Sequence, residues 1–309
     1  MKREGTKISY NGGKIILNGF NTKKSFPYLL LLPSMLVLLL FLYWPTLQSF
    51  SMSLYRQAPF GIRRFFVGLE NYINIFTNPE YLSSLWLTII YALVTISIGL
   101  VVSLLMAVLL NQKLRGIKFY RLVFFIPYAI SPAVAGALWV FLLNPVAGHV
   151  NYFLYKLFGI QPDWFTNGTL AFVAVAIATI WKNMGFNIIF FLAGLQSISE
   201  SIYESAKIDG SSPTNTLMKI TVPLLSPTTF YLITMNIIFS IFESFGTVDI
   251  MTQGGPANAT NFLVYSLYRD SFINFRPGLA AAQSVILLFL VIIATIVHFR
   301  SGGKYVHYQ

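Results

Sequence analysis

Six long apolar runs dominate this sequence and constrain its fold more than any other feature. They lie near residues 26–50, 84–111, 121–143, 170–196, 224–246 and 279–299. Each run is about as long as the roughly 20 residues that a helix needs to cross the hydrocarbon core of a bilayer. Only 10% of the 309 residues are charged, whereas a soluble domain carries about a quarter. The chain is therefore predicted to be an all-α, polytopic membrane protein of about six transmembrane helices.

The distribution of lysine and arginine predicts which side of the membrane each segment faces. With six spans, both termini lie on one side, and the segments on that side hold 14 of the 21 basic residues. The segments on the opposite side hold 6. By the positive-inside rule, both termini are cytoplasmic. This predicts a cytoplasmic N-terminal segment at 1–25, a transmembrane domain at 26–300 and a cytoplasmic tail at 301–309.

The sequence lacks the residue patterns of an enzyme or of a nucleotide-binding subunit. It has no cysteine, and His149, His298 and His307 are not paired at the spacing of metal ligands. No G-x-x-x-x-G-K-[ST] string occurs. Much of the net charge of +11 lies ahead of the first span, without the aromatic residues of a nucleic-acid platform. We therefore expect no catalytic residue, metal, bound cofactor or nucleic-acid partner in this chain.

Helix breakers fall inside several of the apolar runs. Pro127 and Pro132 lie in the third run, and Gly185 lies in the fourth. A proline at membrane depth frees a backbone carbonyl that lipid cannot satisfy, so such helices are expected to face protein or a wet cavity. The pattern predicts a bundle of helices that lines a path.

The polar segment at about 199–223 is expected to fold as a helical hairpin on the cytoplasmic side. Ser199 or Ser201 can cap a first helix, and Ser201 with Glu204 has the spacing of a capping box. Gly210 can end that helix in the left-handed conformation.

A second helix is expected directly after this glycine. Ser212 can cap it and Pro213 suits its first position. Pro223 is expected to end it before the fifth span. The segment would then be two short helices joined by a glycine hinge.

The apolar residues of this hairpin predict contact with another protein. Ile202 and Ala206 share one face of the first helix with Tyr203 beside it, and Leu217 and Ile220 add apolar contacts on the second. A hairpin this small has no apolar partner of its own, so we expect it to enter a groove on a partner. Resting on lipid headgroups is the alternative, which the balanced charge of the hairpin disfavours.

The hairpin resembles the EAA signature of permease subunits in ATP-binding-cassette importers, in its carbohydrate-uptake form EAA-x-x-DGA followed by I-x-LP. The residues that match are Glu204, Ala206, Asp209, Gly210, Ile220, Pro223, Leu224, Leu225 and Pro227. The sequence departs from the pattern at Ser205, Ser211, Thr214 and Val222. FVGLENYINIF (66–76), FFIPYAISPAV (124–134), WKNMGFNIIFFLAGLQ (181–196) and MTQGGPANAT (251–260) resemble the same family, so the likeness covers about residues 26–300.

This resemblance implies a type I importer permease in the plasma membrane of a prokaryote. Such a subunit pairs with a second permease subunit, two ATPase subunits that use ATP and Mg, and an extracytoplasmic solute-binding protein. ATP hydrolysis is expected in the separate ATPase subunits, so this chain is not expected to be an enzyme. The residues expected to couple to the ATPase are Glu204, Ala206, Asp209, Gly210, Leu217, Ile220 and Pro223.

Three further strings indicate the transported solute. VYSLYRDSF (264–272), AAAQSVILLFLVI (280–292) and KYVHYQ (304–309) are most similar to the members of the family that import glycerol phosphates. The resemblance therefore implies sn-glycerol 3-phosphate or a related glycerophosphodiester, with a neutral di- or oligosaccharide as the alternative. An ion-coupled secondary transporter is the alternative from another class, but it would not need the hairpin.

Polar side chains at membrane depth are candidates for the substrate path. A charge near the centre of a span costs roughly 2.5–3.5 kcal/mol, so its presence indicates a function or a partner. The candidate residues are Lys182, Asn183, Asn187, Asn236, Phe239 and Glu243, with Phe242 and Phe245 beside them. In the alternative interpretation, the asparagines bridge helices, Lys182 pairs with Glu243, and the aromatic residues only pack. The sequence leaves both interpretations open.

Overall fold

The computed structural model describes residues 9–11, 14–16, 26–57, 63–112 and 115–302. Most of the predicted segment at 1–25 and most of the predicted tail at 301–309 lie outside the described residues. The chain divides into two units, residues 1–51 and 52–309, which are described separately.

The first unit holds the first predicted span. Two short strands, β1 (Ser9–Asn11) and β2 (Lys14–Ile16), pair antiparallel ahead of it. Helix α1 (Phe26–Leu38), the π-helical turn η1 (Leu39–Tyr43) and α2 (Trp44–Ser53) then run on continuously. Residues Leu30–Ser53 of this helix are long and apolar enough to cross a membrane, as the sequence predicts for 26–50.

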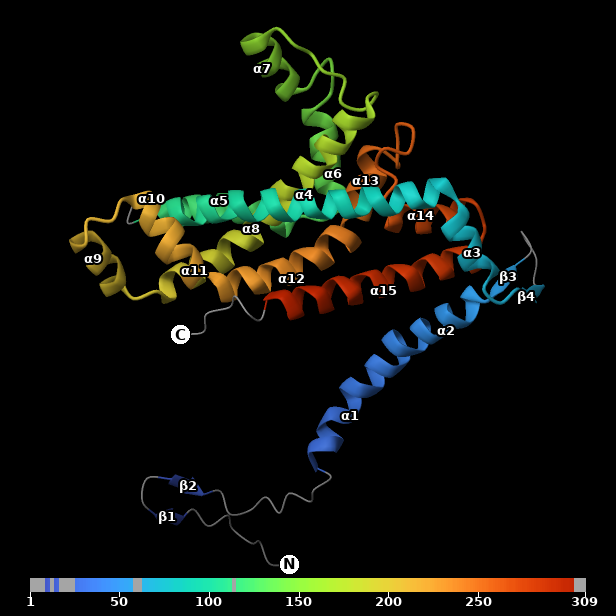
Figure 1. The fold of residues 1–309 in the computed structure, drawn as a ribbon, viewed down its shortest axis with the longest axis horizontal. Coiled ribbons are helices and arrows are strands. Elements are labelled where there is room, and N and C mark those ends of the chain that lie inside the picture. The colour runs from blue at the N-terminus through green and yellow to red at the C-terminus, as the bar shows by residue number, and fades with distance from the viewer. Residues whose placement is uncertain (1–8, 12–13, 17–25, 58–62, 113–114, 303–309) are drawn as a thin grey trace, which may run out of the picture. The chain divides into compact units, whose positions relative to one another are not determined.

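Four more helical segments of spanning length form the bundle of the second unit. They are α4 (Pro79–Leu110), α8 (Gly168–Ser197), α12 (Ser226–Phe242) followed by α13 (Ser244–Met251), and α15 (Pro277–Gly302). Helix α12 packs against α4, α8 and α15, and α4 packs along α8 (Figure 1). The described residues thus contain five candidate spans, or six with the bent pair below, which confirms the predicted all-α membrane fold.

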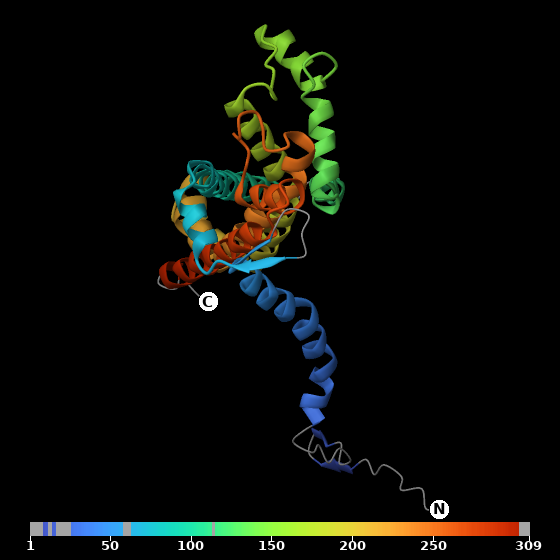
Figure 2. The ribbon, with the colours of Figure 1, turned by 90° about the vertical axis from the view of Figure 1, so that its right-hand side faces the viewer.

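The third predicted span is broken into two helices. Helices α5 (Ile117–Ala129) and α6 (Pro132–Leu142) meet at an angle of 105°, and Figure 2 shows α6 turning away from α5. The break falls at Ser131, which is extended as the residue before a proline prefers to be, and whose hydroxyl caps α6. Pro127 lies within the last turn of α5, so Pro132 and not Pro127 breaks the helix.

Short elements connect the spans at the two ends of the bundle. At one end lie the antiparallel strands β3 (Tyr55–Gln57) and β4 (Arg64–Phe66), α3 (Glu70–Thr77), α14 (Leu263–Tyr268) and the π-helical turn η3 (Arg269–Ile273). Helix α7 (His149–Phe158) follows α6. At the other end lie α9 (Glu200–Ile208), α10 (Pro213–Thr216), the π-helical turn η2 (Leu217–Thr221) and α11 (Val222–Leu224).

The core lies where α8 meets its neighbours. Small residues of α8 such as Ala174 and Ala178 are fully buried, which allows the helices to approach closely. Tyr91 of α4 is fully buried, and its hydroxyl donates to the Thr179 hydroxyl of α8 at 2.6 Å. This buried bond fixes the register of the α4–α8 pair.

Gly185 is not a helix breaker, because α8 continues through it. Its role is close packing. A Cβ at this position would lie 2.7 Å from the Phe124 carbonyl oxygen and 3.0 Å from the Phe125 Cα of α5.

Gly185→Ala is expected to lower the free energy of unfolding by about 1–3 kcal/mol, because the added methyl group must push the backbones of α5 and α8 apart. Gly99→Ala on α4 is the matched control, since its Cβ would meet only Ile180 at 3.9 Å. Thermal unfolding of the purified chain in detergent measures both. Equal stability of the two variants would contradict the packing role.

Candidate functional site

The hairpin of residues 199–223 folds as two helical parts joined at Gly210. Gly210 has φ +73°, the left-handed conformation expected from the sequence. The Gly210 amide donates to the Lys207 carbonyl at 3.1 Å, and the Ser211 amide donates to the Ala206 carbonyl at 2.9 Å. These two bonds are the Schellman motif, which closes the end of α9.

The second helical part begins as predicted but ends later. Ser212 accepts a bond from the Asn215 amide at 3.3 Å, and Pro213 occupies the first turn. Pro223 lies inside α11, and the helix breaks only at Leu225. The π-helical turn η2 directly before it shifts the hydrogen-bond pattern, which accommodates a residue without an amide hydrogen.

The predicted capping box does not form. Helix α9 starts at Glu200 with Ser199, the first of the two predicted caps, as the N-cap residue, so Ser201 lies inside the helix. The Ser199 hydroxyl is 2.8 Å from the Ser201 hydroxyl, so the two serines bond to each other. Glu204 is left exposed on the surface of the hairpin.

The apolar face of α9 packs on the chain itself, contrary to the sequence-based expectation. Ala206 is buried, and Ile202 and Tyr203 pack against a core cluster that includes Leu195 of α8 and Leu225 beside α12. The hairpin is not isolated, because the ends of α8 and α12 lie beneath it. The apolar face that was predicted to contact a partner is therefore covered by the chain itself.

Other residues of the hairpin remain exposed. Of the predicted coupling residues, Glu204, Asp209, Gly210 and Pro223 are exposed, and Leu217 and Ile220 are half-buried. Two apolar side chains that the sequence analysis missed project further: Ile208 is 85% exposed and Met218 is 61% exposed. Ile208 lies two residues after Ala206, and Met218 lies next to Leu217. Residues at these spacings do not share a helix face, so the sequence could have placed both side chains away from the buried face.

Inside the bundle, Lys182 and Glu243 form an ion pair. The Lys182 Nζ donates to Glu243 Oε2 at 3.0 Å and to Asn183 Oδ1 at 3.3 Å, and lies 5.4 Å from the centre of the Tyr128 ring. The Lys182 side chain is 6% exposed and that of Glu243 is 33% exposed. In this conformation the Lys182 ammonium therefore has a carboxylate partner within the bundle.

Two of the candidate asparagines bridge helices. The Asn236 side-chain amide of α12 donates to Asn187 Oδ1 of α8 at 2.8 Å and to its own helix at the Leu232 carbonyl. Both residues are buried. Together with Asn183 they line a cavity of about 10 Å³, which is about the space of one water molecule. The bridging interpretation is thus the one that this conformation supports.

The three phenylalanines near Glu243 do not form a single stack. Phe239 packs edge-on against Phe186 with ring centres 5.3 Å apart, whereas Phe245 packs against Tyr265 and Tyr268. Phe242 is 45% exposed. Phe239 and Phe242 lie on α12, whereas Phe245 lies on α13, beyond the break at Glu243.

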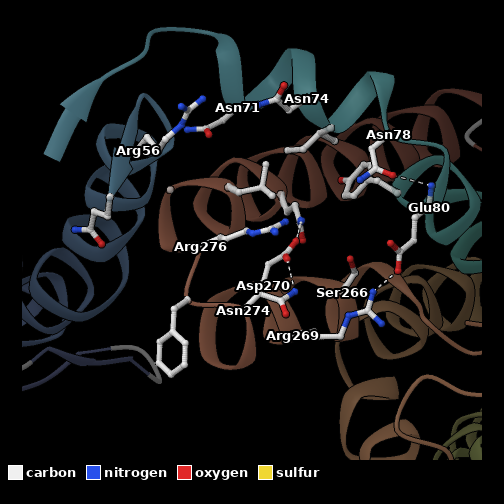
Figure 3. Close-up of a pocket in the computed structure, with 17 residues that line it drawn as sticks. Arg56, Asn71, Asn74, Asn78, Glu80, Ser266, Arg269, Asp270, Asn274 and Arg276 are labelled. Atoms are coloured by element: carbon white, nitrogen blue, oxygen red, sulfur yellow. Dashed lines mark hydrogen bonds and ion pairs between the residues drawn. The ribbon is translucent and has the colours of Figure 1, made fainter. Parts of the chain in front are cut away.

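A polar pocket that the sequence analysis missed lies at the end of the bundle opposite the hairpin. Its volume is about 540 Å³, and it is enclosed by β3, α3, the start of α4, η3 and the start of α15. Figure 3 shows side chains from these separate elements grouped around it. Its charged lining residues are Arg56, Glu80, Arg269, Asp270 and Arg276.

Ion pairs and hydrogen bonds from side-chain amides organise the lining of this pocket. Arg56 pairs with Glu70, and Arg269 pairs with Glu80. Asp270 accepts a bond from Asn274 at 2.8 Å. Positions as distant as 80 and 269 meet here, and no local sequence pattern predicts such a meeting.

Comparison with known proteins gives consistent results. Residues 99–301 match the family described as binding-protein-dependent transport system inner membrane component. The chain is 41% identical over 285 residues to the sn-glycerol-3-phosphate transport system permease protein UgpA of Rhizobium meliloti (strain 1021), covering 92% of this chain and 97% of the relative. It is 42% identical over 284 residues to UgpA of Salmonella typhimurium (strain LT2), covering 92% and 96%.

Solved structures share the fold. A chain of a bacterial ABC transporter involved in the import of the acidic polysaccharide alginate superimposes with a TM-score of 0.78 at 21% identity, covering 91% of this chain and 96% of that one. A bacterial alginate transporter in complex with alginate pentasaccharide-bound periplasmic protein gives 0.76 at 21% identity, covering 89% and 92%. At this identity the likeness concerns the fold.

Proposed function

Because the chain belongs to the family of inner membrane components of binding-protein-dependent transport systems, we propose that it is the permease subunit of an ATP-driven importer of sn-glycerol 3-phosphate or a related glycerophosphodiester. Family membership makes it a multi-pass permease of the inner membrane. The identity of the solute, the use of ATP and the partner subunits go beyond family membership and are proposed. The single observation that supports this choice of solute is the 41% sequence identity with a glycerol 3-phosphate permease across nine-tenths of both chains.

The proposed partners are a second permease subunit, two ATPase subunits and an extracytoplasmic solute-binding protein. The positive-inside rule supports a cytoplasmic location of both termini and of the hairpin. The exposed charged and apolar residues of the hairpin support a contact with an ATPase subunit. ATP and Mg would be bound by those ATPase subunits, so this chain contributes the path and not the hydrolysis.

The packing of the hairpin suggests how ATPase movement reaches the spans. Ile202 and Tyr203 of α9 pack against the cluster that includes Leu195 and Leu225, at the ends of α8 and α12. The Thr221 hydroxyl also lies 3.4 Å from the Tyr203 hydroxyl, which ties the two helical parts together. A push on the exposed side of such a unit is transmitted to α8 and α12 as a rigid-body shift.

Helices α8 and α12 are joined at membrane depth in this conformation. The asparagine bridge and the ion pair join α8 to α12, and the cavity between them has room for about one water molecule. A shift of α8 relative to α12 would open this contact. In the proposed cycle, the polar residues at membrane depth hold α8 and α12 together in this arrangement.

Reconstitution in proteoliposomes tests the proposal. With its proposed partner subunits and binding protein, the chain is expected to support uptake of labelled sn-glycerol 3-phosphate that stops when ATP or the binding protein is omitted. Uptake of a neutral disaccharide in place of glycerol 3-phosphate would contradict the solute. Uptake by the chain alone, driven by an ion gradient without nucleotide, would contradict the ATP-driven mechanism.

A further inference from the structure

The pocket opposite the hairpin contains one arginine whose charge is not neutralised. Arg56 and Arg269 are both paired with glutamates, but the Arg276 guanidinium has no ion pair with any described residue. Arg276 lies at the junction of η3 and α15, with its backbone amide bonded to the Asp270 carbonyl at 2.8 Å. The pocket thus holds a cation available to an anionic ligand.

Two buried polar groups in the same pocket lack hydrogen-bond partners. Gln283 is 3% exposed, and its amide nitrogen donates to Asp270 Oδ2 at 2.5 Å, while its Oε1 has no partner among the described residues. Tyr81 is 4% exposed, and its hydroxyl also has no partner there. Buried polar groups are rarely left unpaired. An acceptor oxygen and a phenol in one pocket fit a ligand that carries hydroxyl groups.

The carboxylates that line the pocket already form an ion pair or hydrogen bonds with neighbouring side chains. Glu80 is bonded by Arg269 and by the Asn258 side chain, and Asp270 is bonded by Asn274 and Gln283. Glu80 is thus paired with Arg269, and both oxygens of Asp270 accept bonds from amides, so neither carboxylate forms an ion pair with Arg276 among the described residues. The volume of about 540 Å³ lies in the usual range of small-molecule sites.

We propose that this pocket binds a glycerol phosphate group, with the phosphate on Arg276 and the glycerol hydroxyls on Gln283 and Tyr81. On the proposed topology it faces the extracytoplasmic side, and the inference rests on the proposed function for the identity of the ligand. The same chemical group can come from free sn-glycerol 3-phosphate or from the headgroup of phosphatidylglycerol. The site is separate from Lys182, which Glu243 already neutralises.

Ligand binding to the reconstituted complex tests the site without transport. The full transporter is placed in nanodiscs of phosphatidylcholine without binding protein, and binding of sn-glycerol 3-phosphate and of inorganic phosphate is titrated. Arg276→Gln is expected to weaken both about tenfold, because it removes a charge-assisted contact. Tyr81→Phe is expected to lower the affinity for glycerol 3-phosphate about fivefold. The affinity for inorganic phosphate is expected to stay unchanged, because that anion carries no glycerol hydroxyls.

Arg300→Gln is the matched control, because Arg300 lies on α15 at the opposite end from the pocket. It is expected to change neither affinity, and Arg276→Lys is expected to recover part of both. Unchanged binding of both probes by Arg276→Gln would overturn the proposal, as would equal losses for both probes in Tyr81→Phe.

A second arm identifies the source of the group. If the lipid headgroup occupies the pocket, phosphatidylglycerol co-purifies with the wild type, is reduced in Arg276→Gln, and competes with soluble glycerol 3-phosphate. Binding of soluble glycerol 3-phosphate in phosphatidylcholine alone assigns the pocket to the free solute. The uptake assay separates this inference from the proposed function: normal uptake by the wild type with no effect of Arg276→Gln on binding removes the pocket site only.

Discussion

Replacing Ile208 and Met218 together with aspartate is expected to reduce ATP-driven uptake at least tenfold. Both side chains are exposed on the hairpin, at 85% and 61%, so their loss does not disturb the core of the chain. Burying side chains of this size in a partner groove contributes about 1.5–3 kcal/mol each, and a carboxylate in the same place prevents the burial. Co-purification of the ATPase subunits, together with uptake, measures the effect.

The control for this prediction separates lost apolar contact from added charge. Asn215→Asp introduces one carboxylate at an exposed position of the same hairpin and removes no apolar side chain. It is expected to retain most of the uptake and of the ATPase association. If the double aspartate variant also assembled and transported normally, the contact with the ATPase would have to lie elsewhere on the chain.

The positions of the spans were predictable because length and apolarity decide whether a helix can cross a bilayer. The runs predicted near 84–111, 170–196 and 279–299 agree closely with α4, α8 and α15. The bend between α5 and α6 was predictable only in part. Two prolines indicated it, but whether a proline breaks a helix depends on its place within the turn, and only Pro132 does so.

The role of the hairpin residues was harder to predict, because it depends on what lies beneath them. A periodic apolar face shows that a helix is covered, but not by what. Ile202, Tyr203 and Ala206 form such a face, and the ends of the chain's own spans cover it. Helical spacing could have placed Ile208 and Met218 away from the buried face, but it could not show that they matter, because isolated apolar residues are common on protein surfaces.

The polar pocket could not be predicted at all from local patterns. Arg56, Tyr81, Arg269 and Gln283 come from four separate parts of the sequence, and in their own segments they resemble ordinary loop or helix residues. Only the folding of β3 and α3 against η3 and α15 brings them together. The ion pair of Lys182 and Glu243 is different, because the sequence indicated it as one of two alternatives: both charges lie at membrane depth, where an unpaired charge is costly.

Glu243→Gln is expected to lower the free energy of unfolding by about 3 kcal/mol. The substitution leaves the Lys182 ammonium, whose side chain is 6% exposed, without its carboxylate partner. Breaking a buried pair by removing one partner costs about 3–5 kcal/mol, and the value is at the lower end here because Glu243 is 33% exposed. Thermal unfolding of the purified chain measures the loss.

The double variant Lys182→Met with Glu243→Leu distinguishes a structural pair from a ligand for the solute. Replacing both charges with apolar side chains of similar size is often neutral for stability, so most of the lost stability is expected to return. If the pair only joins α8 and α12, uptake of glycerol 3-phosphate returns with it. Restored stability without uptake would instead show that the charged side chains of the pair are needed for transport itself, because packing and charge neutrality would both be intact while the charges would be absent.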